Sequence, residues 1–266
     1  MQKEKSKKRF TILDTSIWTI LAYFIIYSFI GYIIETLFAM INYNVIESRQ
    51  SFLYGPFCGI YGVGAVFMYV ILNKYFKKNK HLLFFGGFIV GSIVEYVLSF
   101  LGEVILNVRW WDYSDRFLNL NGRICFLYSL FWGALGLYFM TVINPFVDKI
   151  IGFLKKKINI KILKIIVLVI FIFLMIDCIL SGIAIECYLT RQAVENELDV
   201  PNKEQTIAEY ELINSNEKLT AIINKFWNDE KMVMTYPNLT ITLNDGSIVK
   251  VREYLPEIKP YYYKFK

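Results

Sequence analysis

GSIVEYVLSFLGEVILNVRWWDYSDRFLNLNGRICFLYSLFWG, residues 91–133, contains two long apolar runs that flank a short polar loop. The first run contains Glu95, and an ionised carboxylate costs roughly 2.5–3.5 kcal/mol when it is inserted into hydrocarbon. A chain that keeps such a group in an apolar segment usually needs it for a function or for contact with a partner. We therefore predict that Glu95 lies in a membrane-spanning helix and contacts protein or water.

Small and polar residues recur along one face of the helix predicted around Glu95. They follow helical spacing and comprise Gly87, Gly91, Glu95, Ser99 and Gly102. Small residues let helices approach closely in a membrane, so this face is expected to contact protein. Across the bundle interior, we expect Glu95 to face Glu35 or Asp177.

The composition is that of a membrane protein. Of 266 residues, 56% are hydrophobic and 20% are charged, and the mean hydropathy is +0.42. Residues 1–189 carry 19 Lys and Arg against 11 Asp and Glu, whereas residues 190–266 carry 10 against 12. Because the basic excess belongs to the membrane part, we expect no nucleic-acid partner.

Five apolar runs reach the ~20 residues that cross a bilayer: 17–41, 57–76, 82–106, 124–146 and 165–187. Lys and Arg accumulate in cytoplasmic segments, and 15 of the 19 lie before the first run, between the fourth and fifth, or from the last residues of the second run to the start of the third. We expect an all-α five-helix transmembrane bundle with a small α+β extracytoplasmic C-terminal appendage. Its parts would be a basic cytoplasmic N-terminus (1–16), a transmembrane domain (17–187) and an extracytoplasmic tail (188–266).

With this orientation, the ionisable residues of the spans converge on the outer half of the membrane. An aqueous cavity open to the outside is the simplest arrangement that tolerates them. The candidate ligand-binding residues of this cavity are Glu35, Glu95, Arg123, Asp177 and Ser181.

The polar loop lies directly above Glu95. We hypothesise that residues 110–123, including Trp111, Asp112 and Asn121, fold over the cavity mouth as a gate. Arg123 would pair with Glu95, Glu103 or Asp112 at rest and exchange to an anionic part of the ligand. The alternative is a simple aromatic belt, because Trp110 and Trp111 favour the membrane interface.

The tail differs in composition from the spans. Residues 203–232 have helical spacing, and the Asn244-Asp245-Gly246 tripeptide between two β-rich runs predicts a hairpin. The last residues, KPYYYKFK (259–266), either rest on lipid headgroups or are unstructured.

Several sequence blocks resemble the bacterial ABC-transporter permease family of the CmpB type. They are FIGYIIE (29–35), YGPFCGIYG (54–62), WDYS (111–114), NGRIC (121–125), and Asp177 with Ser181. The resemblance covers about residues 20–190 and implies a transport role in the bacterial cell membrane. The chain lacks a GxxxxGK[ST] sequence, so any ATP-driven step needs a separate ATPase subunit. The predicted cytoplasmic loops, 73–81 and 148–164, leave little room for docking helices.

Three functions stay open from the residues alone. The first is a transporter component that binds a polar or cationic solute in the outward-facing cavity. The second is a membrane enzyme acting on a lipid or lipid-linked substrate at the outer leaflet, and the third is an assembly or sensor protein. An enzyme is disfavoured because there is no catalytic His/Cys constellation. His81 is the only histidine and the four cysteines lack a CxxC pair, so no metal and no cofactor is expected. The candidate partners are the lipid bilayer, the ATPase subunit and a second copy of the chain.

Overall fold

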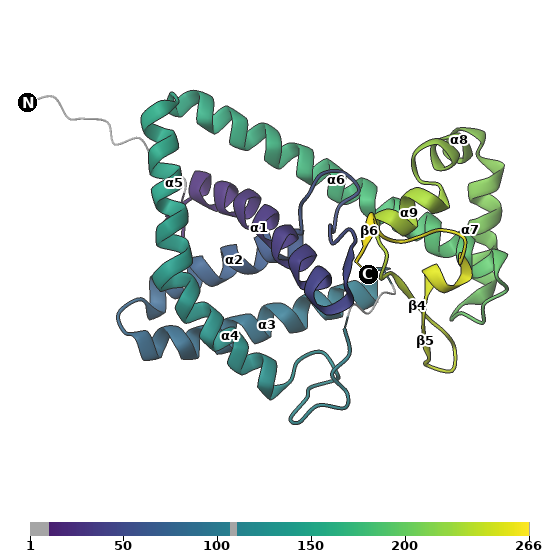
Figure 1. The fold of residues 1–266 in the computed structure, drawn as a ribbon, viewed down its shortest axis with the longest axis horizontal. Helices are drawn as coiled ribbons and strands as arrows, with labels where there is room; N and C mark the ends of the chain where they lie inside the picture. The colour runs from purple at the N-terminus through teal and green to yellow at the C-terminus, as the bar shows by residue number, and fades with distance from the viewer. Residues whose placement is uncertain (1–10, 107–110, 266) are drawn as a thin grey trace, which may run out of the picture.

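The computed structural model describes residues 11–106 and 111–265. Within these ranges, five helices are long and apolar enough to cross a membrane, which confirms the predicted bundle (Figure 1). They are α1 (Ile17–Tyr43), α2 (Gly59–Ile71) with the π-helix η1 (Leu72–Phe76), α3 (Lys80–Leu106), α4 (Phe126–Tyr138) with the π-helix η2 (Phe139–Ile143) and α5 (Asn144–Lys157), and α6 (Ile160–Glu195).

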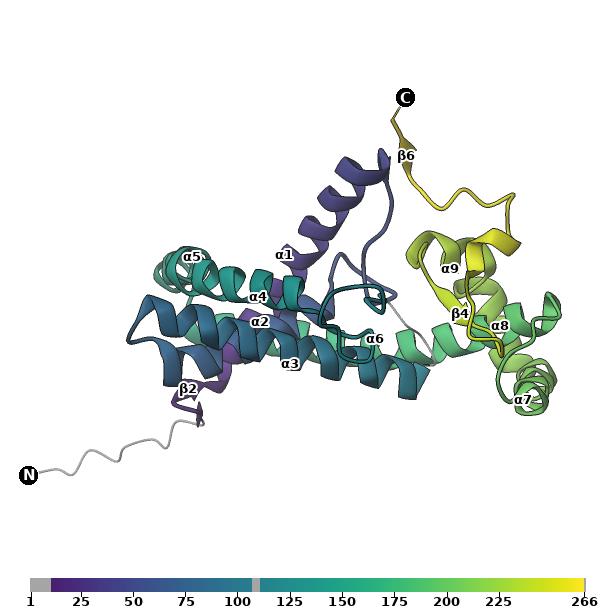
Figure 2. The same cartoon turned by 90° about the horizontal axis from the view of Figure 1, so that it is seen from below.

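The connection between the fourth and fifth spans is helical, which corrects the loop expected at 148–164. Helix α5 continues from η2, and α6 begins after only two residues, where the Asn159 side chain accepts a hydrogen bond from the Lys161 N–H at 2.9 Å. Pro145 lies in the first turn of α5 and has no N–H to donate, so the helix changes pitch just before it. Helix α5 turns away from α4 and is seen end-on in Figure 2, where α3 and α4 run lengthwise. It therefore crosses one end of the bundle.

Helices α3 and α4 pack closely because glycines face each other. A Cβ atom built on Gly87 would lie 2.8 Å from the Trp132 carbonyl oxygen and 3.0 Å from the Gly136 Cα. A Cβ atom on Gly91 would lie 2.5 Å from the side chain of Trp132. The small-residue face of α3 therefore contacts protein, as the spacing predicts, and its partner is α4.

The tail packs on the last turns of α6. The helices α7 (Lys203–Ser215), α8 (Glu217–Phe226) and α9 (Asp229–Thr235) replace the single helical stretch expected at 203–232. The chain breaks there because Asn216 and Asn228 each cap a new helix with a side-chain oxygen. Buried residues of α6, among them Tyr188, share one hydrophobic core with Met232 and Val233 of α9.

Short strands complete the tail. The predicted hairpin is present as β4 (Thr240–Thr242) and β5 (Ile248–Lys250), followed by the 3-10 helix η3 (Val251–Tyr254). The last strand, β6 (Tyr263–Lys264), pairs antiparallel with β3 (Val45–Ile46), which directly follows α1. Figure 2 shows β6 beside the end of α1. A further pair, β1 (Thr11–Ile12) with β2 (Thr15–Ser16), precedes α1.

We call the end of the bundle that carries the tail the tail end. The loops 44–58 and 111–125 and the last turns of α6 also lie there (Figure 1). Most of the candidate residues, and the cavity described below, belong to this end.

Candidate functional site

Glu95 is held by two neutral donors on the packed face of α3. Its carboxylate accepts a hydrogen bond from the Trp132 indole Nε1 on α4 at 2.9 Å and another from the Tyr113 hydroxyl at 3.1 Å. The residue is only 8% exposed. The expected partners, Glu35 and Asp177, are therefore not the ones found. The small-residue face of α3 packs on α4, which directs Glu95 toward that helix.

Tyr113 ties the polar loop to Glu95. Its ring stacks on Tyr128 of α4 with the ring centroids 4.6 Å apart, and its N–H donates to the Gly122 carbonyl at 2.8 Å. Burial and the neighbouring Glu95 carboxylate raise the pKa of Tyr113 well above its ordinary value, so the phenol stays protonated and able to donate. Sequence reasoning did not select Tyr113, although its place in the WDYS block is a signal.

Arg123 forms an ion pair with Glu103 at the tail end of α3. Its Nη1 lies 2.7 Å from a Glu103 carboxylate oxygen and 3.3 Å from the Ser99 Oγ. The guanidinium also lies over the rings of Tyr96 and Phe100, at 5.8 and 5.5 Å from their centroids. One of the three predicted partners of Arg123 is thus present in the structure.

One N–H group of the Arg123 guanidinium makes no hydrogen bond among the described residues. Its Nε is buried and has no hydrogen-bond partner among the described residues. A buried N–H without a partner costs about 1–3 kcal/mol, so an additional acceptor would be bound favourably there. The Glu103 side chain is 38% exposed, so the rest of the chain leaves the carboxylate side of the pair partly uncovered.

Trp111 and Asn121 position the backbone around Arg123. The Trp111 Nε1 donates to the Arg123 carbonyl at 2.9 Å, and the Asn121 amide donates to the Tyr96 hydroxyl at 2.8 Å. Both residues therefore have hydrogen-bond partners within the protein. Trp110, at the start of the predicted gate, lies outside the described residues.

Asp112 shapes the loop itself. Its Oδ1 accepts hydrogen bonds from the Ser114 N–H at 3.0 Å and the Ser114 hydroxyl at 2.6 Å. Gly122 has a φ of +66°, and a Cβ atom there would clash with Asp112 and Ser114. Asp112 thereby holds the turn that carries Arg123.

Asp177 and Ser181 form a second, separate cluster on α6. Asp177, which is 1% exposed, accepts a hydrogen bond from the Tyr54 N–H at 3.1 Å, and the Ser181 Oγ accepts one from the Leu53 N–H at 2.8 Å. The Ser181 hydroxyl in turn donates to the Asp177 carbonyl at 2.6 Å. The two side chains therefore satisfy backbone groups of the irregular segment before α2.

Glu35 forms a third cluster. Its carboxylate accepts a hydrogen bond from the Tyr61 hydroxyl at 2.6 Å, which joins α1 to α2. A Cβ atom on Gly31 would clash with Tyr61, so a glycine is needed for this close approach. The three intramembrane carboxylates thus have three different sets of donors, and no hydrogen bond or ion pair among the described residues joins them around one ligand.

Glu47 was missed by the sequence analysis. It is 4% exposed, and its carboxylate contacts Arg49 at 2.6 Å, the Asn238 amide at 3.3 Å and Arg252 at 3.6 Å. From the sequence alone, a charged residue just beyond a membrane span is expected to be a solvated surface group. Only the return of the tail shows that Glu47 is buried.

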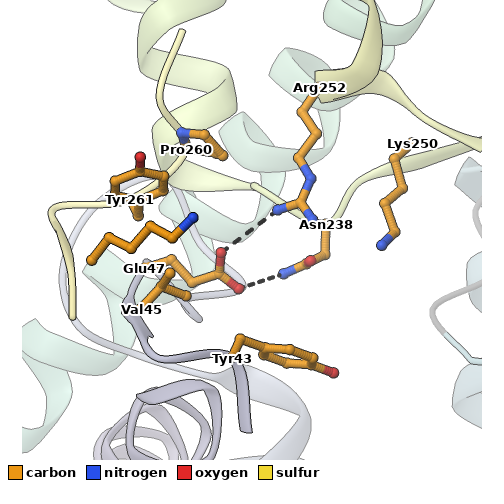
Figure 3. A pocket seen from close by; sticks show the side chains of 9 residues that line it. Tyr43, Val45, Glu47, Asn238, Lys250, Arg252, Pro260 and Tyr261 are labelled. Carbon is orange, nitrogen blue, oxygen red and sulfur yellow. Dashed lines mark hydrogen bonds and ion pairs between the residues drawn. The ribbon is translucent and has the colours of Figure 1, made fainter. Parts of the chain in front are cut away.

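A cavity of about 360 Å³ surrounds Glu47 (Figure 3). In Figure 3, Arg252 and Asn238 reach the carboxylate, while Tyr261 and Lys250 lie on opposite sides of the cavity. Its walls come from the end of α1, from β3 and from the tail: Tyr43, Val45, Glu47, Asn238, Lys250, Arg252, Pro260, Tyr261 and Lys264.

One comparison with known proteins gives a match. A family model described as "Putative ABC-transporter type IV" matches residues 22–182, which is more than half of the chain and includes every intramembrane carboxylate described above. Neither a curated protein nor a solved structure matches the chain.

Proposed function

This chain belongs to the family described as "Putative ABC-transporter type IV", and on that premise we propose that it binds and passes a polar solute as the membrane component of a transporter. The solute would enter at the tail end of the bundle. Energy would come from a separate ATPase subunit, because the sequence has no ATP-binding GxxxxGK[ST] motif.

The distribution of charge supports an orientation with the tail end outside. The opposite end of the described bundle carries ten lysines: Lys74, Lys77, Lys78, Lys80, Lys149, Lys155, Lys156, Lys157, Lys161 and Lys164. Lys and Arg gather on the cytoplasmic side of membrane proteins. The Arg123 pair would then face the exterior.

The observation that carries the proposal is the Arg123–Glu103 ion pair above Glu95. The guanidinium has an unused Nε donor, and the Glu103 side is open to solvent. An anionic group of the solute can therefore replace Glu103 with little loss, because an arginine binds carboxylates and phosphates through two parallel hydrogen bonds. Glu95, held by neutral donors, would receive a hydrogen-bond donor of the same solute.

Helix α5 supplies the surface for an ATPase partner. It crosses the lysine-rich end of the bundle and has Lys155, Lys156 and Lys157 in its last turn. Its packed side includes the buried Asn144 and Val147, while Lys149 is exposed. Helix α5 would thus serve as the docking helix for which the predicted cytoplasmic loops leave little room.

Tryptophan fluorescence tests the solute site, because Trp111 and Trp132 both donate to its residues. Purified full-length protein in lipid nanodiscs would be titrated with free amino acids, dipeptides, polyamines and inorganic phosphate. We expect a saturable change in emission with at least one of these solutes. A wild-type protein that responds to none of them would contradict the proposal.

Matched variants locate the site. Arg123→Lys should weaken binding by about tenfold or more, because an ammonium does not reproduce the two parallel hydrogen bonds. Glu95→Gln should weaken it while leaving membrane insertion intact. Arg116→Lys is the control, since Arg116 is exposed and its ion pair within the described residues is with the neighbouring, exposed Asp115. If Arg123→Lys and Arg116→Lys had the same solute affinity, the hypothesis that Arg123 acts in a gate would be ruled out.

A further inference from the structure

The cavity around Glu47 carries a strong excess of positive charge. Three cationic side chains line it, namely Lys250, Arg252 and Lys264, and Arg49 approaches the same carboxylate. Glu47 is the only acidic residue among the residues that line this cavity. The four cations against one carboxylate leave a local charge of about +3, and an anion would offset it.

Glu47 does not form ion pairs with all of these cationic side chains. Arg49 makes the short contact with the carboxylate at 2.6 Å, and Arg252 lies farther away at 3.6 Å. Lys250 and Lys264 form no ion pair with any carboxylate in the part of the chain that the structure describes. Arg252 and the two lysines therefore keep donors for a ligand.

The cavity lies where the lipid-facing surface of α1 ends. Phe38 is 53% exposed and Ile41 is 74% exposed, and Tyr43, the last residue of α1, forms a wall of the cavity. On the tail side, Tyr262 and Tyr263 are 62% and 55% exposed. Exposed apolar side chains followed by tyrosines mark the level at which lipid tails give way to headgroups.

We propose that this cavity binds the anionic headgroup of a phospholipid. The phosphate would contact Arg252, Lys250 and Lys264, the glycerol end would fit within the volume of about 360 Å³, and the acyl chains would lie along the apolar end of α1. A site of this size is within the ordinary range of small-ligand cavities and larger than a bare ion requires. The inference is independent of the proposed transport function, because the cavity shares no residue with the Glu95 and Arg123 clusters.

Binding would fasten the tail to the bundle. Strand β6 already pairs with β3, and the Tyr262 N–H donates to the Ile46 carbonyl at 2.8 Å. Lys250 and Lys264 come from the tail, whereas Tyr43 and Glu47 come from the bundle side. A headgroup held between them would join both walls.

The test uses the full chain in dodecyl maltoside and the short-chain lipid dihexanoylphosphatidylglycerol. Binding is followed as the rise in the unfolding temperature with lipid concentration, because a ligand that binds only the folded state raises it. Dihexanoylphosphatidylcholine and inorganic phosphate are the comparison ligands. We expect saturable binding of phosphatidylglycerol, with weaker binding of the other two.

The double variant Lys250→Gln/Lys264→Gln removes two charges from exposed side chains, so it should fold normally and retain the unfolding temperature of the wild type without lipid. Its dissociation constant for phosphatidylglycerol should rise by about thirtyfold, since each lysine near an anionic headgroup contributes roughly a fivefold factor. Lys218→Gln/Lys231→Gln removes two exposed charges elsewhere on the tail, and its affinity should stay within about twofold of the wild type.

Four results would overturn the inference. Absence of binding in the wild type or equal affinity in both double variants would show that the cavity is not the site. Phosphatidylcholine bound as tightly as phosphatidylglycerol would remove the anionic preference. Inorganic phosphate bound as tightly as phosphatidylglycerol would show that free phosphate, and not a lipid, is the ligand.

Discussion

Arg123 and Arg252 both pair with carboxylates at the tail end of the molecule, but they reach them by different routes. Arg123 pairs with Glu103 inside one helical hairpin, α3–loop–α4. Arg252 contacts Glu47 across the junction between the tail and the first span. The first pair follows from the way a hairpin closes on itself. The second pair forms only when the tail folds back onto the segment that follows α1. The two regions can therefore be perturbed separately.

The largest effect is expected where α3 meets α4. In Gly91→Leu the new side chain would occupy the position of Trp132, since even a Cβ atom would lie 2.5 Å from that side chain. The helices must separate, and overpacking of this kind costs about 3 kcal/mol. Thermal unfolding in detergent measures the loss, and Trp132 and Glu95 should lose their contact.

Gly182→Leu on α6 is the matched control, because no atom lies within 4 Å of a Cβ at that position. The tail should resist proteolysis equally in both variants, since the change at Gly91 breaks only the first region. Equal unfolding temperatures for the two variants would mean that the glycine contact does not hold the hairpin together.

A smaller effect is expected at the junction with the tail. Glu47→Gln keeps the size of the side chain but removes the charge that pairs with Arg49 and Arg252. Breaking a fully buried pair costs more, but these arginines are partly exposed, so we expect a loss of about 2 kcal/mol. Limited trypsin digestion should cut the tail faster than in the wild type.

The control for this change is Glu257→Gln, an exposed carboxylate of the tail. It should leave the digestion rate unchanged. If Glu47→Gln instead weakened the Arg123 region and left the tail protected, the two regions would be coupled and the comparison would fail.

The smallest effect concerns the turn of the β4–β5 hairpin. Hydrogen bonds from Ser247, first from its side chain and then from its backbone, lower the pKa of Asp245. A lowered pKa in the folded state adds stability that is present at neutral pH and lost as the pH falls below about 4. Hydrogen exchange at the turn should therefore show more protection in the wild type than in Asp245→Asn at pH 5, by about a factor of two. This difference should shrink as the pH falls below about 4, and a difference that stayed constant would assign the protection to another cause.

Much of the bundle could be predicted because membrane insertion is governed by local sequence. Span length, apolar runs and the small-residue face of α3 depend on neighbouring residues, and all of them appear in the structure. The boundaries were less predictable. Helix α6 extends to Glu195, and the helical spacing at 203–232 did not reveal the caps at Asn216 and Asn228.

Among the candidate residues, too, some contacts could be predicted from the sequence and others could not. Arg123 and Glu103 lie at the two ends of one loop, so their pairing could be anticipated. Glu35, Glu95 and Asp177 were expected to share a cavity because they have similar depths in the membrane. Depth alone does not determine direction: each carboxylate contacts the donor that its own helix face presents.

The sequence alone predicts five membrane-spanning helices, a packed small-residue face on α3 and an arginine beside a carboxylate in the connecting loop. Hydrophobic length, glycine spacing and loop closure are short-range properties, so they can be read from the chain. The structure adds that α3 packs on α4, that Glu47 is buried, that Asp177 and Ser181 hold the backbone before α2, and that the tail and the end of α1 line a positively charged cavity. These features join segments from distant parts of the chain, and their partners are fixed by packing, which no local pattern records.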